Sequence, residues 1–251
     1  MSVTSACHGT PPPIPDGVSV RVYGWEFDPF SEKVRLALTL KGVRFDVINC
    51  DLKNKPKFFL DANPLGEVPV LIHNGVTLTE SEVCIDYIDH VYSNSPFLYP
   101  RDAVARAEVC ILMARYTNKV MPSVYSALKD QNNECIPDLL SAHEKYVEAP
   151  LKQLNSPFFG GQSLNAMDIH IWPFLEVMDA KASVGDITIP ATRFPTMISY
   201  IERMKEVPAV KEVMHTLDDF KGFWETWKTP GPPDYNYHSK YPFYTADEEI
   251  L

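Results

Sequence analysis

The hydrophobic pattern between residues 18 and 47 changes its period twice, and this constrains the fold more than any other feature of the chain. Residues 18–23 (VSVRVY) alternate valines with polar residues, which predicts a strand. Asp28-Pro29 is a helix-start signal, and Gly42 is expected to end that helix. Residues 43–47 alternate again. A strand–helix–strand run of this length predicts two parallel strands joined by a right-handed crossover.

The next segment predicts a hairpin followed by a helix. Residues 51–66 form a loop with one helical turn, and residues 67–72 form a strand that contains Pro69. Asn74-Gly75 is the strongest short hairpin signal, so the following residues are expected to return antiparallel. A helix is expected to begin at Ser81. This order of elements matches a thioredoxin-like α/β domain.

The remainder of the chain shows helical periodicity and no strand alternation. Asn165 and Asp168 have the spacing of a capping box at a helix start. The expected helices span residues 102–129, 137–154, 165–183, 195–207, 208–215 and 217–227. The expected domains are a mobile Pro-rich arm (1–17), a thioredoxin-like domain (18–92), an all-helical domain (102–228) and a tail (229–251), with a short linker after the first domain.

Charge and cysteine content exclude several classes of protein. The chain has 23 Lys and Arg against 33 Asp and Glu, a net charge of −10, which argues against binding nucleic acid or an anionic membrane. No stretch approaches 18 apolar residues, and the N-terminus does not have the pattern of a signal peptide. The five cysteines lack C-x-x-C spacing, which favours reduced thiols in the cytoplasm over disulfides or a metal site.

Several segments together resemble a cytosolic glutathione transferase, and most closely the omega class. They are FDPFSEKVRLALTLKG, DLKNKP, NPLGEVPVL, LTESEVCIDYID, FFGG and AMDIHIWPF, and the resemblance covers about residues 18 to 228. It implies an α/β thioredoxin-like N-terminal domain, an all-α C-terminal domain and a homodimer. It also implies a detoxifying enzyme that takes glutathione as a substrate, together with a small-molecule acceptor.

The residues support glutathione binding on chemical grounds as well. Glutathione carries two carboxylates, one ammonium and a thiol, so its site needs a cation, a carboxylate, a helix N-terminus and an exposed backbone edge. Lys55 offers the cation, and Val68-Pro69 offers the edge, because proline frees its neighbours from the strand ladder. Glu80 offers the carboxylate for the ammonium, and Ser81 a hydroxyl at a helix start. Three of these have a plainer interpretation: Lys55 as a solvated loop lysine, Val68-Pro69 as an ordinary edge-strand proline and Ser81 as a simple helix cap.

Matching motifs to the family gives the full predicted set and one further expectation. The resemblance implies that the Val68-Pro69 bond is cis, so that Val68 pairs with the cysteinyl backbone of glutathione. The predicted glutathione-binding residues are Phe30, Leu52, Lys55, Val68, Pro69, Glu80 and Ser81.

Asp28 departs from the omega pattern. Omega enzymes have a cysteine before the first helix, whose thiolate bonds to the sulfur of glutathione, and Asp28 occupies that position here. A carboxylate forms no mixed disulfide, so thiol transfer and dehydroascorbate reduction are in doubt. The helix N-terminus favours an ionised Asp28, which would raise the pKa of a nearby glutathione thiol. Asp28 is therefore either a base that takes the thiol proton or only a helix cap.

Other candidates for the chemistry are weaker. Tyr23 ends the first predicted strand, where tyrosine-type classes have their catalytic hydroxyl, and Ser31 lies inside the first helix. Cys50 fits packing better than catalysis. The acceptor pocket is expected between the loop 24–28 and the C-terminal helices. Its candidate lining residues, each of which also fits a core position, are Tyr116, Met121, Tyr125, Phe220 and Trp224.

Three hypotheses follow from the sequence. The first is an omega-like transferase that conjugates or transfers glutathione to a small electrophilic or hydrophobic acceptor. The second is a non-catalytic glutathione-binding or structural protein on the same fold. The third is a relative of the intracellular chloride-channel proteins, which are related to omega transferases. The charged residues of the first helix, among them Lys33 and Arg35, argue against the third because they make a poor bilayer segment.

Overall fold

The protein was analysed as a computed structural model, which describes residues 7, 9–93, 96–129, 134–227 and 233–246. Parts of the predicted arm, linker and tail lie outside these residues. The chain forms two compact units, one of Met1–Ser95 with His215–Leu251 and one of Pro96–Met214. Among the described helices, none is long and apolar enough to cross a bilayer.

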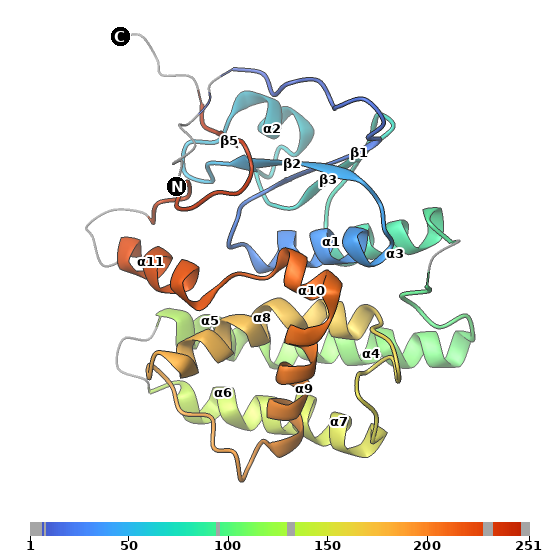
Figure 1. Ribbon diagram of the computed structural model, residues 1–251, viewed down its shortest axis with the longest axis vertical. Helices are drawn as coiled ribbons and strands as arrows, with labels where there is room; N and C mark the ends of the chain where they lie inside the picture. Colours follow the sequence, from blue (N-terminus) through green and yellow to red (C-terminus); the bar gives the residue numbers. More distant parts are fainter. Residues whose placement is uncertain (1–6, 8, 94–95, 130–133, 228–232, 247–251) are drawn as a thin grey trace. The chain divides into compact units, whose positions relative to one another are not determined.

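The first unit is built on a five-stranded mixed sheet in the order β4-β3-β1-β2-β5 (Figure 1). β1 pairs parallel with β2 and antiparallel with β3, and β3 pairs antiparallel with β4. The elements are β1 (Val20–Gly24), α1 (Pro29–Leu40), β2 (Phe45–Cys50), α2 (Lys57–Ala62), β3 (Val70–His73), β4 (Val76–Leu78), α3 (Ser81–Val91), α11 (Leu217–Trp227) and β5 (Phe243–Tyr244). The predicted strand–helix–strand run and the hairpin are confirmed.

Local sequence explains the two sharpest changes of direction. Gly42 follows α1 with a φ of 63°, the left-handed conformation that glycine adopts without a steric cost. Asn74 and Gly75 have φ values of 49° and 80°, as a two-residue hairpin loop with right-handed strand twist requires. The turn at Asn74-Gly75 therefore fixes the antiparallel return of β4.

Strand β5 was not predicted. It comes from the tail and pairs parallel with β2, with Asn49 opposite Phe243 and Cys50 opposite Tyr244. Cys7, in the predicted arm, bridges to Tyr244 on the other side. The arm also contacts β1, because Arg21 donates to the carbonyl of Pro12 at 2.8 Å. The tail thus covers the edge of β2 that would otherwise be open to pairing.

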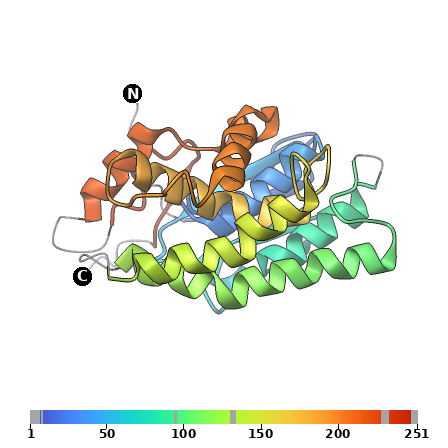
Figure 2. The ribbon, with the colours of Figure 1, turned by 90° about the horizontal axis from the view of Figure 1, so that it is seen from below.

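The second unit is entirely helical in its described residues (Figures 1 and 2). α4 packs against α5 and α8, and α9 packs against α8 and α10. The helices are α4 (Ala103–Lys119), α5 (Met121–Lys129), α6 (Ile136–His143), a π-helical turn η1 (Glu144–Glu148), α7 (Ala149–Leu154), α8 (Ala166–Ser183), α9 (Pro195–Glu206) and α10 (Pro208–Val213).

Two of the predicted helices are divided in the structure. The helix expected over 102–129 breaks at Val120, just before Pro122, and the helix expected over 137–154 contains η1 close to Pro150. Proline has no N–H to donate within a helix, so the regular ladder is interrupted near each one. The capping box at the start of α8 is present as predicted: the Asn165 side chain accepts from the backbone of Asp168, and Asp168 accepts from that of Asn165.

The predicted fold class is confirmed: a thioredoxin-like α/β domain and an all-α domain. The grouping of the last helix differs from the prediction. Residues 217–227 were expected in the helical domain, whereas α11 belongs to the same compact unit as the sheet. Phe220 and Phe223 of α11 pack on Phe27 of the loop after β1. Helical periodicity in the sequence shows that a helix has an apolar face, but not which other element that face packs against.

Candidate functional site

Strand register brings the predicted glutathione-binding segments to one edge of the sheet. Gly24, the last residue of β1, lies opposite Asn49 near the end of β2, so the loops that follow both strands leave the sheet on the same side. Tyr23 lies opposite Val70, the first residue of β3. The segment before β3, which contains Val68-Pro69, therefore reaches the same edge, as does the end of β4 before α3. This edge is the candidate site.

Asp28 is the N-cap of α1. Its Oδ2 accepts a hydrogen bond from the backbone N–H of Ser31 at 2.6 Å, and Pro29 follows as the first helical residue. The side chain is buried, and burial raises the pKa of its carboxyl, although Ser31, Arg35 and the helix N-terminus act in the opposite direction. Burial, which depends on the tertiary packing, is thus a larger effect on this carboxyl than the helix N-terminus that the sequence indicated.

A buried amine lies close to this cap. Lys33 is completely buried, and its Nζ lies 4.8 Å from the centre of the Phe30 ring. Burial lowers the pKa of its amine to about 7, and the charges of Glu82 and Asp28 counteract this only in part. The beginning of α1 therefore combines a carboxyl and an amine that both have unusual pKa values, a pattern that is frequent at functional sites.

Lys55 lies over the turn that leads to β3. Gly66 has a φ of 65°, and a Cβ atom at this position would lie 2.8 Å from Lys55 Nζ. The backbone conformation favours glycine at residue 66, and the absence of a side chain there leaves room for the lysine. Lys55 is half-buried, which suits a cation that meets a ligand carboxylate at the surface.

The Val68-Pro69 bond is cis, as the resemblance implied. Val68 is half-buried and lies just before β3, outside the strand ladder. The carbonyl of Glu67 accepts from the Asn63 side chain at 2.8 Å, which ties this segment to the end of α2. The Val68 backbone therefore lies outside the strand ladder, and its pairing with glutathione stays a prediction.

Glu80 and Ser81 form the start of α3. Glu80 is exposed and has a φ of 64° with a ψ of 111°, which is unfavourable for a residue with a side chain. Ser81, the first residue of the helix, is buried. Strained backbone that persists next to an open helix N-terminus is typical of ligand-binding positions.

The weaker candidates near the sheet are core residues. Tyr23 packs against Phe58 and Phe59 with ring centres 5.2 and 6.4 Å away, and burial raises the pKa of its hydroxyl. Cys50 belongs to the same hydrophobic cluster, where burial raises its thiol pKa far above the ordinary value. Leu52 packs on the edge of this cluster. Both Tyr23 and Cys50 are thus protonated at neutral pH.

The candidate acceptor residues are divided between the two units. In the helical unit, Tyr116 is completely buried among aromatic rings, and Met121 is also buried, so both are core residues, whereas Tyr125 is exposed. In the first unit, Phe220 is buried and stacks on the half-buried Trp224.

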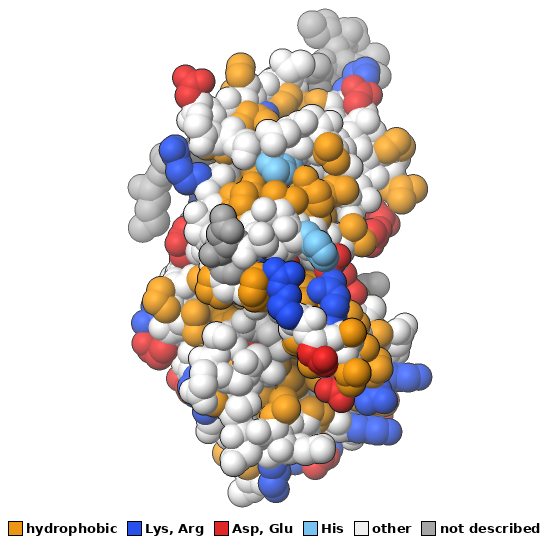
Figure 3. All heavy atoms as spheres, turned by 90° about the vertical axis from the view of Figure 1, so that its right-hand side faces the viewer, with side chains coloured by type: hydrophobic (Ala, Val, Ile, Leu, Met, Phe, Trp, Pro, Cys, Tyr) orange, Lys and Arg blue, Asp and Glu red, His pale blue; other side chains and the backbone are white. Residues whose placement is uncertain are grey.

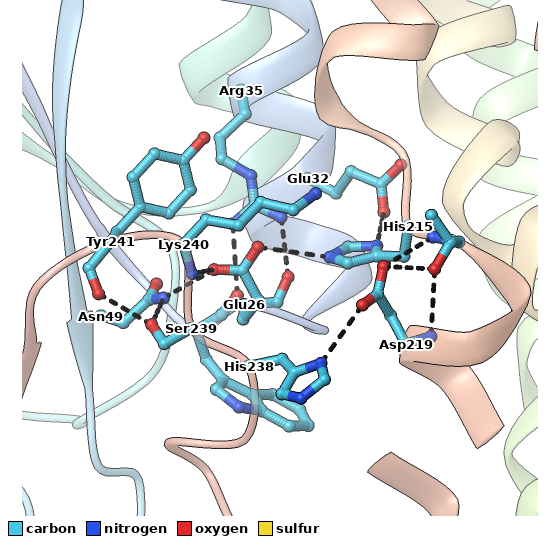
Figure 4. Close-up of polar contacts among 12 residues, drawn as sticks. Glu26, Glu32, Arg35, Asn49, His215, Asp219, His238, Ser239, Lys240 and Tyr241 are labelled. Carbon is cyan, nitrogen blue, oxygen red and sulfur yellow. Dashed lines mark hydrogen bonds and ion pairs between the residues drawn. The ribbon is translucent and has the colours of Figure 1, made fainter. Parts of the chain in front are cut away.

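A buried polar cluster around Glu26 was missed by the sequence analysis (Figure 4). Glu26 Oε2 accepts from Asn49 Nδ2 and from the backbone N–H of Lys240, each at 3.0 Å. Its Oε1 lies 3.5 Å from Nε2 of His215. Lys240 is 214 residues away along the chain, and no local pattern links positions so far apart.

Comparison with known proteins decides the family. The family model described as "Glutathione S-transferase, N-terminal domain" matches residues 22–96, and the corresponding C-terminal domain model matches residues 114–216. Glutathione S-transferase omega-1 of Sus scrofa is 31% identical over 232 residues, which cover 90% of this chain and 93% of that protein. The chain belongs to the glutathione S-transferase family. The resemblance to its omega class is thereby confirmed.

Other relatives of this transferase agree. Glutathione S-transferase omega-1 of Mus musculus is 36% identical over 68% of this chain and 71% of that protein. Pyrimidodiazepine synthase of Drosophila melanogaster is 31% identical over 91% and 94%. Among solved structures, the Tau class transferase MiGSTU of mango (Mangifera indica) has a TM-score of 0.76 at 26% identity, covering 82% of this chain and 97% of that one.

Proposed function

We propose that this chain is an omega-like glutathione transferase that conjugates or transfers glutathione to a small electrophilic or hydrophobic acceptor. The observation that carries this proposal is the Glu80-Ser81 corner, where a strained carboxylate residue precedes a buried hydroxyl at a helix start. The corner fits the α-amino and carboxylate groups of a γ-glutamyl end. Lys55 fits the glycyl carboxylate, and Val68 fits the backbone between the two ends.

Two further parts of the proposal concern the compartment and the assembly of the protein. Cys7, Cys50, Cys84, Cys110 and Cys135 form no disulfide, which supports a reducing compartment such as the cytoplasm. Exposed valines on β4 and α3, Val76 and Val83, together with Val104 and Ile111 on α4, support a homodimer in which the sheet unit of one subunit packs on the helical unit of its partner. Figure 3 shows one face of the protein, on which hydrophobic side chains lie among charged ones.

Replacing Ser81 by Ala tests the glutathione site. We expect glutathione to bind more weakly by about 1–2 kcal/mol, because a charge-assisted hydrogen bond is lost. Titration calorimetry of the native and variant proteins measures this difference. Ser199→Ala is the control, because Ser199 is an exposed hydroxyl on α9 that donates only to the carbonyl of Pro195. Equal affinities of native and Ser81→Ala proteins would contradict the assignment.

The alternative function is glutathione binding without turnover, and Asp28 favours it because no sulfur stands at the start of α1. Turnover of an aryl chloride such as chlorodinitrobenzene distinguishes the two functions. Binding with turnover supports the transferase, whereas binding without turnover, on this and on disulfide acceptors, supports the alternative.

A further inference from the structure

Glu26 connects three parts of the first unit that are distant in the sequence. It lies in the loop between β1 and α1, with 1% of its surface exposed. Its carboxylate accepts from Asn49 on β2 and from Lys240 in the tail, and it lies beside His215, just before α11 (Figure 4). Burial acts to raise the pKa of this carboxyl, but His215, Arg35 and the Lys240 N–H together lower it. Glu26 is therefore ionised at neutral pH.

The backbone of the same loop is held from α1. Arg35, which is buried, donates to the carbonyl of Glu26 at 2.8 Å and to that of Trp25 at 3.3 Å. Asp28 follows two residues later as the cap of α1. The position of the α1 N-terminus therefore depends on how the loop is anchored at Glu26.

The tail is fastened on both sides of its contact with Glu26. Before it, Tyr235 packs on Trp25 with ring centres 4.9 Å apart, and Tyr237 packs so closely on Gly222 that a Cβ atom there would overlap its hydroxyl. After it, Ser239 accepts from Asn49 Nδ2 at 2.7 Å, and β5 joins the sheet. The tail consequently forms a fixed support for the loop.

We propose that Glu26 is a positioning residue that anchors the loop between β1 and α1 to the tail. Through this anchor it sets the geometry in which bound glutathione reacts with its acceptor. This inference rests on the proposed function and on the resemblance to omega enzymes, which implies that the sulfur of glutathione lies beside residue 28 at the α1 N-terminus. Among the described residues, the hydrogen bonds of Glu26 go to β2 and the tail rather than to Lys55, Val68 or Ser81. Loss of the anchor is therefore expected to change the rate of reaction but not the binding of glutathione.

Glu26→Gln tests this role in the full chain. The amide keeps the shape of the side chain and one acceptor oxygen, but it removes the negative charge that strengthens the hydrogen bonds from Asn49 and Lys240, so the anchor is weakened. We expect kcat with chlorodinitrobenzene to fall about tenfold or more, since small displacements of reacting groups cost rates of this order. The dissociation constant of glutathione, measured by calorimetry, is expected to change less than twofold. Amide exchange is expected to accelerate in residues 25–28.

Two further variants make the test specific. Glu26→Leu, which has a side chain of similar size but no acceptor atom, is expected to lower kcat further than Glu26→Gln does. Removal of residues 233–251 takes away the support, so it is expected to lower kcat as Glu26→Gln does and to leave the dissociation constant of glutathione nearly unchanged. Removal of residues 247–251 alone is the control and is expected to change neither quantity. If Glu26→Gln does not fold, the two truncations provide the same comparison.

The outcomes separate this inference from the proposed function. A native protein that binds no glutathione would overturn the proposed function and the positioning role with it. If the native protein binds and turns over, unchanged kcat in Glu26→Gln and in the longer truncation overturns the positioning role alone. Equal losses of kcat and of glutathione affinity also overturn it, because they indicate general damage to the unit.

Discussion

The resemblance to omega enzymes implies that a carboxylate at residue 28 occupies the position of a catalytic cysteine, and the structure shows what this carboxylate does for the helix. Asp28 caps α1 through its hydrogen bond to Ser31. In this unit the two buried thiols, Cys84 and Cys50, do not replace the missing sulfur, because burial raises the pKa of Cys84 to about 12 and that of Cys50 further. A thiol at such a pKa is a poor nucleophile at neutral pH.

Asp28→Cys is expected to introduce thiol transfer that the native protein performs slowly. The variant places a sulfur at a helix N-terminus, where a thiolate is stabilised and can form and release a mixed disulfide. The measurement is dehydroascorbate reduction and thiol transfer with glutathione. Asp28→Asn is the control. Asparagine caps a helix nearly as well as aspartate, so this variant is expected to lose less than about 1 kcal/mol of stability. It is expected to gain no thiol transfer but to conjugate glutathione faster, because the negative charge that repels the glutathione thiolate is removed. A native protein as fast as Asp28→Cys in thiol transfer would show that Asp28 does not limit this chemistry.

Lys33 gives a prediction about the pH dependence of stability. Its pKa is lowered from 10.5 to about 7 in the folded protein. Between these two pH values the unfolded chain binds more protons at this lysine than the folded protein does, so the folded protein becomes more stable as the pH rises. The stability that this group contributes is fully present above pH 10.5 and is lost as the pH falls toward 7. Lys33→Met removes the cost of burying the charge. We expect its stability gain over the native protein to shrink by up to about 1.4 kcal/mol per pH unit as the pH rises from 7.

Urea unfolding of Lys33→Met and native protein between pH 7 and 10 measures this trend. Lys57→Met is the matched control, because the Lys57 side chain is 85% exposed and pairs only with Asp61 of the next turn. Its difference from the native protein is expected to stay constant with pH. A constant difference for Lys33→Met as well would show that the amine is charged at all these pH values.

At the scale of single elements, several hydrogen bonds converge on the start of α8. The Asp168 carboxylate accepts from the backbone N–H groups of Asn165, Phe159 and Gly160 and from the Tyr200 hydroxyl, at 2.8 to 3.1 Å. Burial nevertheless raises the pKa of this carboxyl to about 6. One side chain thus joins α8, α9 and the loop before α8.

Asp168→Asn is expected to destabilise the protein by about 1–3 kcal/mol, because the amide turns a donor toward groups that are themselves donors. The midpoint of urea unfolding measures this loss. Asp186→Asn, which changes an exposed carboxylate paired with Lys181, is expected to have an effect within about 0.5 kcal/mol. If both variants unfold at the same midpoint, the hydrogen bonds of Asp168 contribute little to stability.

At the scale of the whole molecule, the proposed homodimer has a direct test. We expect the native protein to sediment at twice its mass of 28.4 kDa at micromolar concentration. Val83 is 52% exposed on α3, and Val83→Lys would place a charge in the proposed interface and shift the protein toward the monomer. Leu60→Lys, on α2 outside the proposed interface, is the control and is expected to stay dimeric. A native monomer under these conditions would contradict the proposal.

The sequence by itself determined those parts of the fold that depend on neighbouring residues. Asp28-Pro29 and Gly42 set the ends of α1, Asn74-Gly75 set the hairpin, and Asn165 with Asp168 set the start of α8. Each of these works through hydrogen bonds or backbone conformations within a few residues, so their spacing in the sequence is sufficient. The motifs from Lys55 to Ser81 likewise indicated the candidate glutathione site.

Only the tertiary structure decided how the tail and the last helix are used. β5, the packing of α11 on the loop after β1, and the cluster around Glu26 join residues separated by about two hundred positions. The tertiary structure also decided the pKa shifts at Asp28 and Lys33, because both arise mainly from burial by neighbouring side chains. At Asp28 this burial outweighs the effect of the local helix N-terminus. Residues that are so far apart along the chain and meet only in the folded protein leave no periodic pattern in the sequence, because the fold alone sets which of them come into contact.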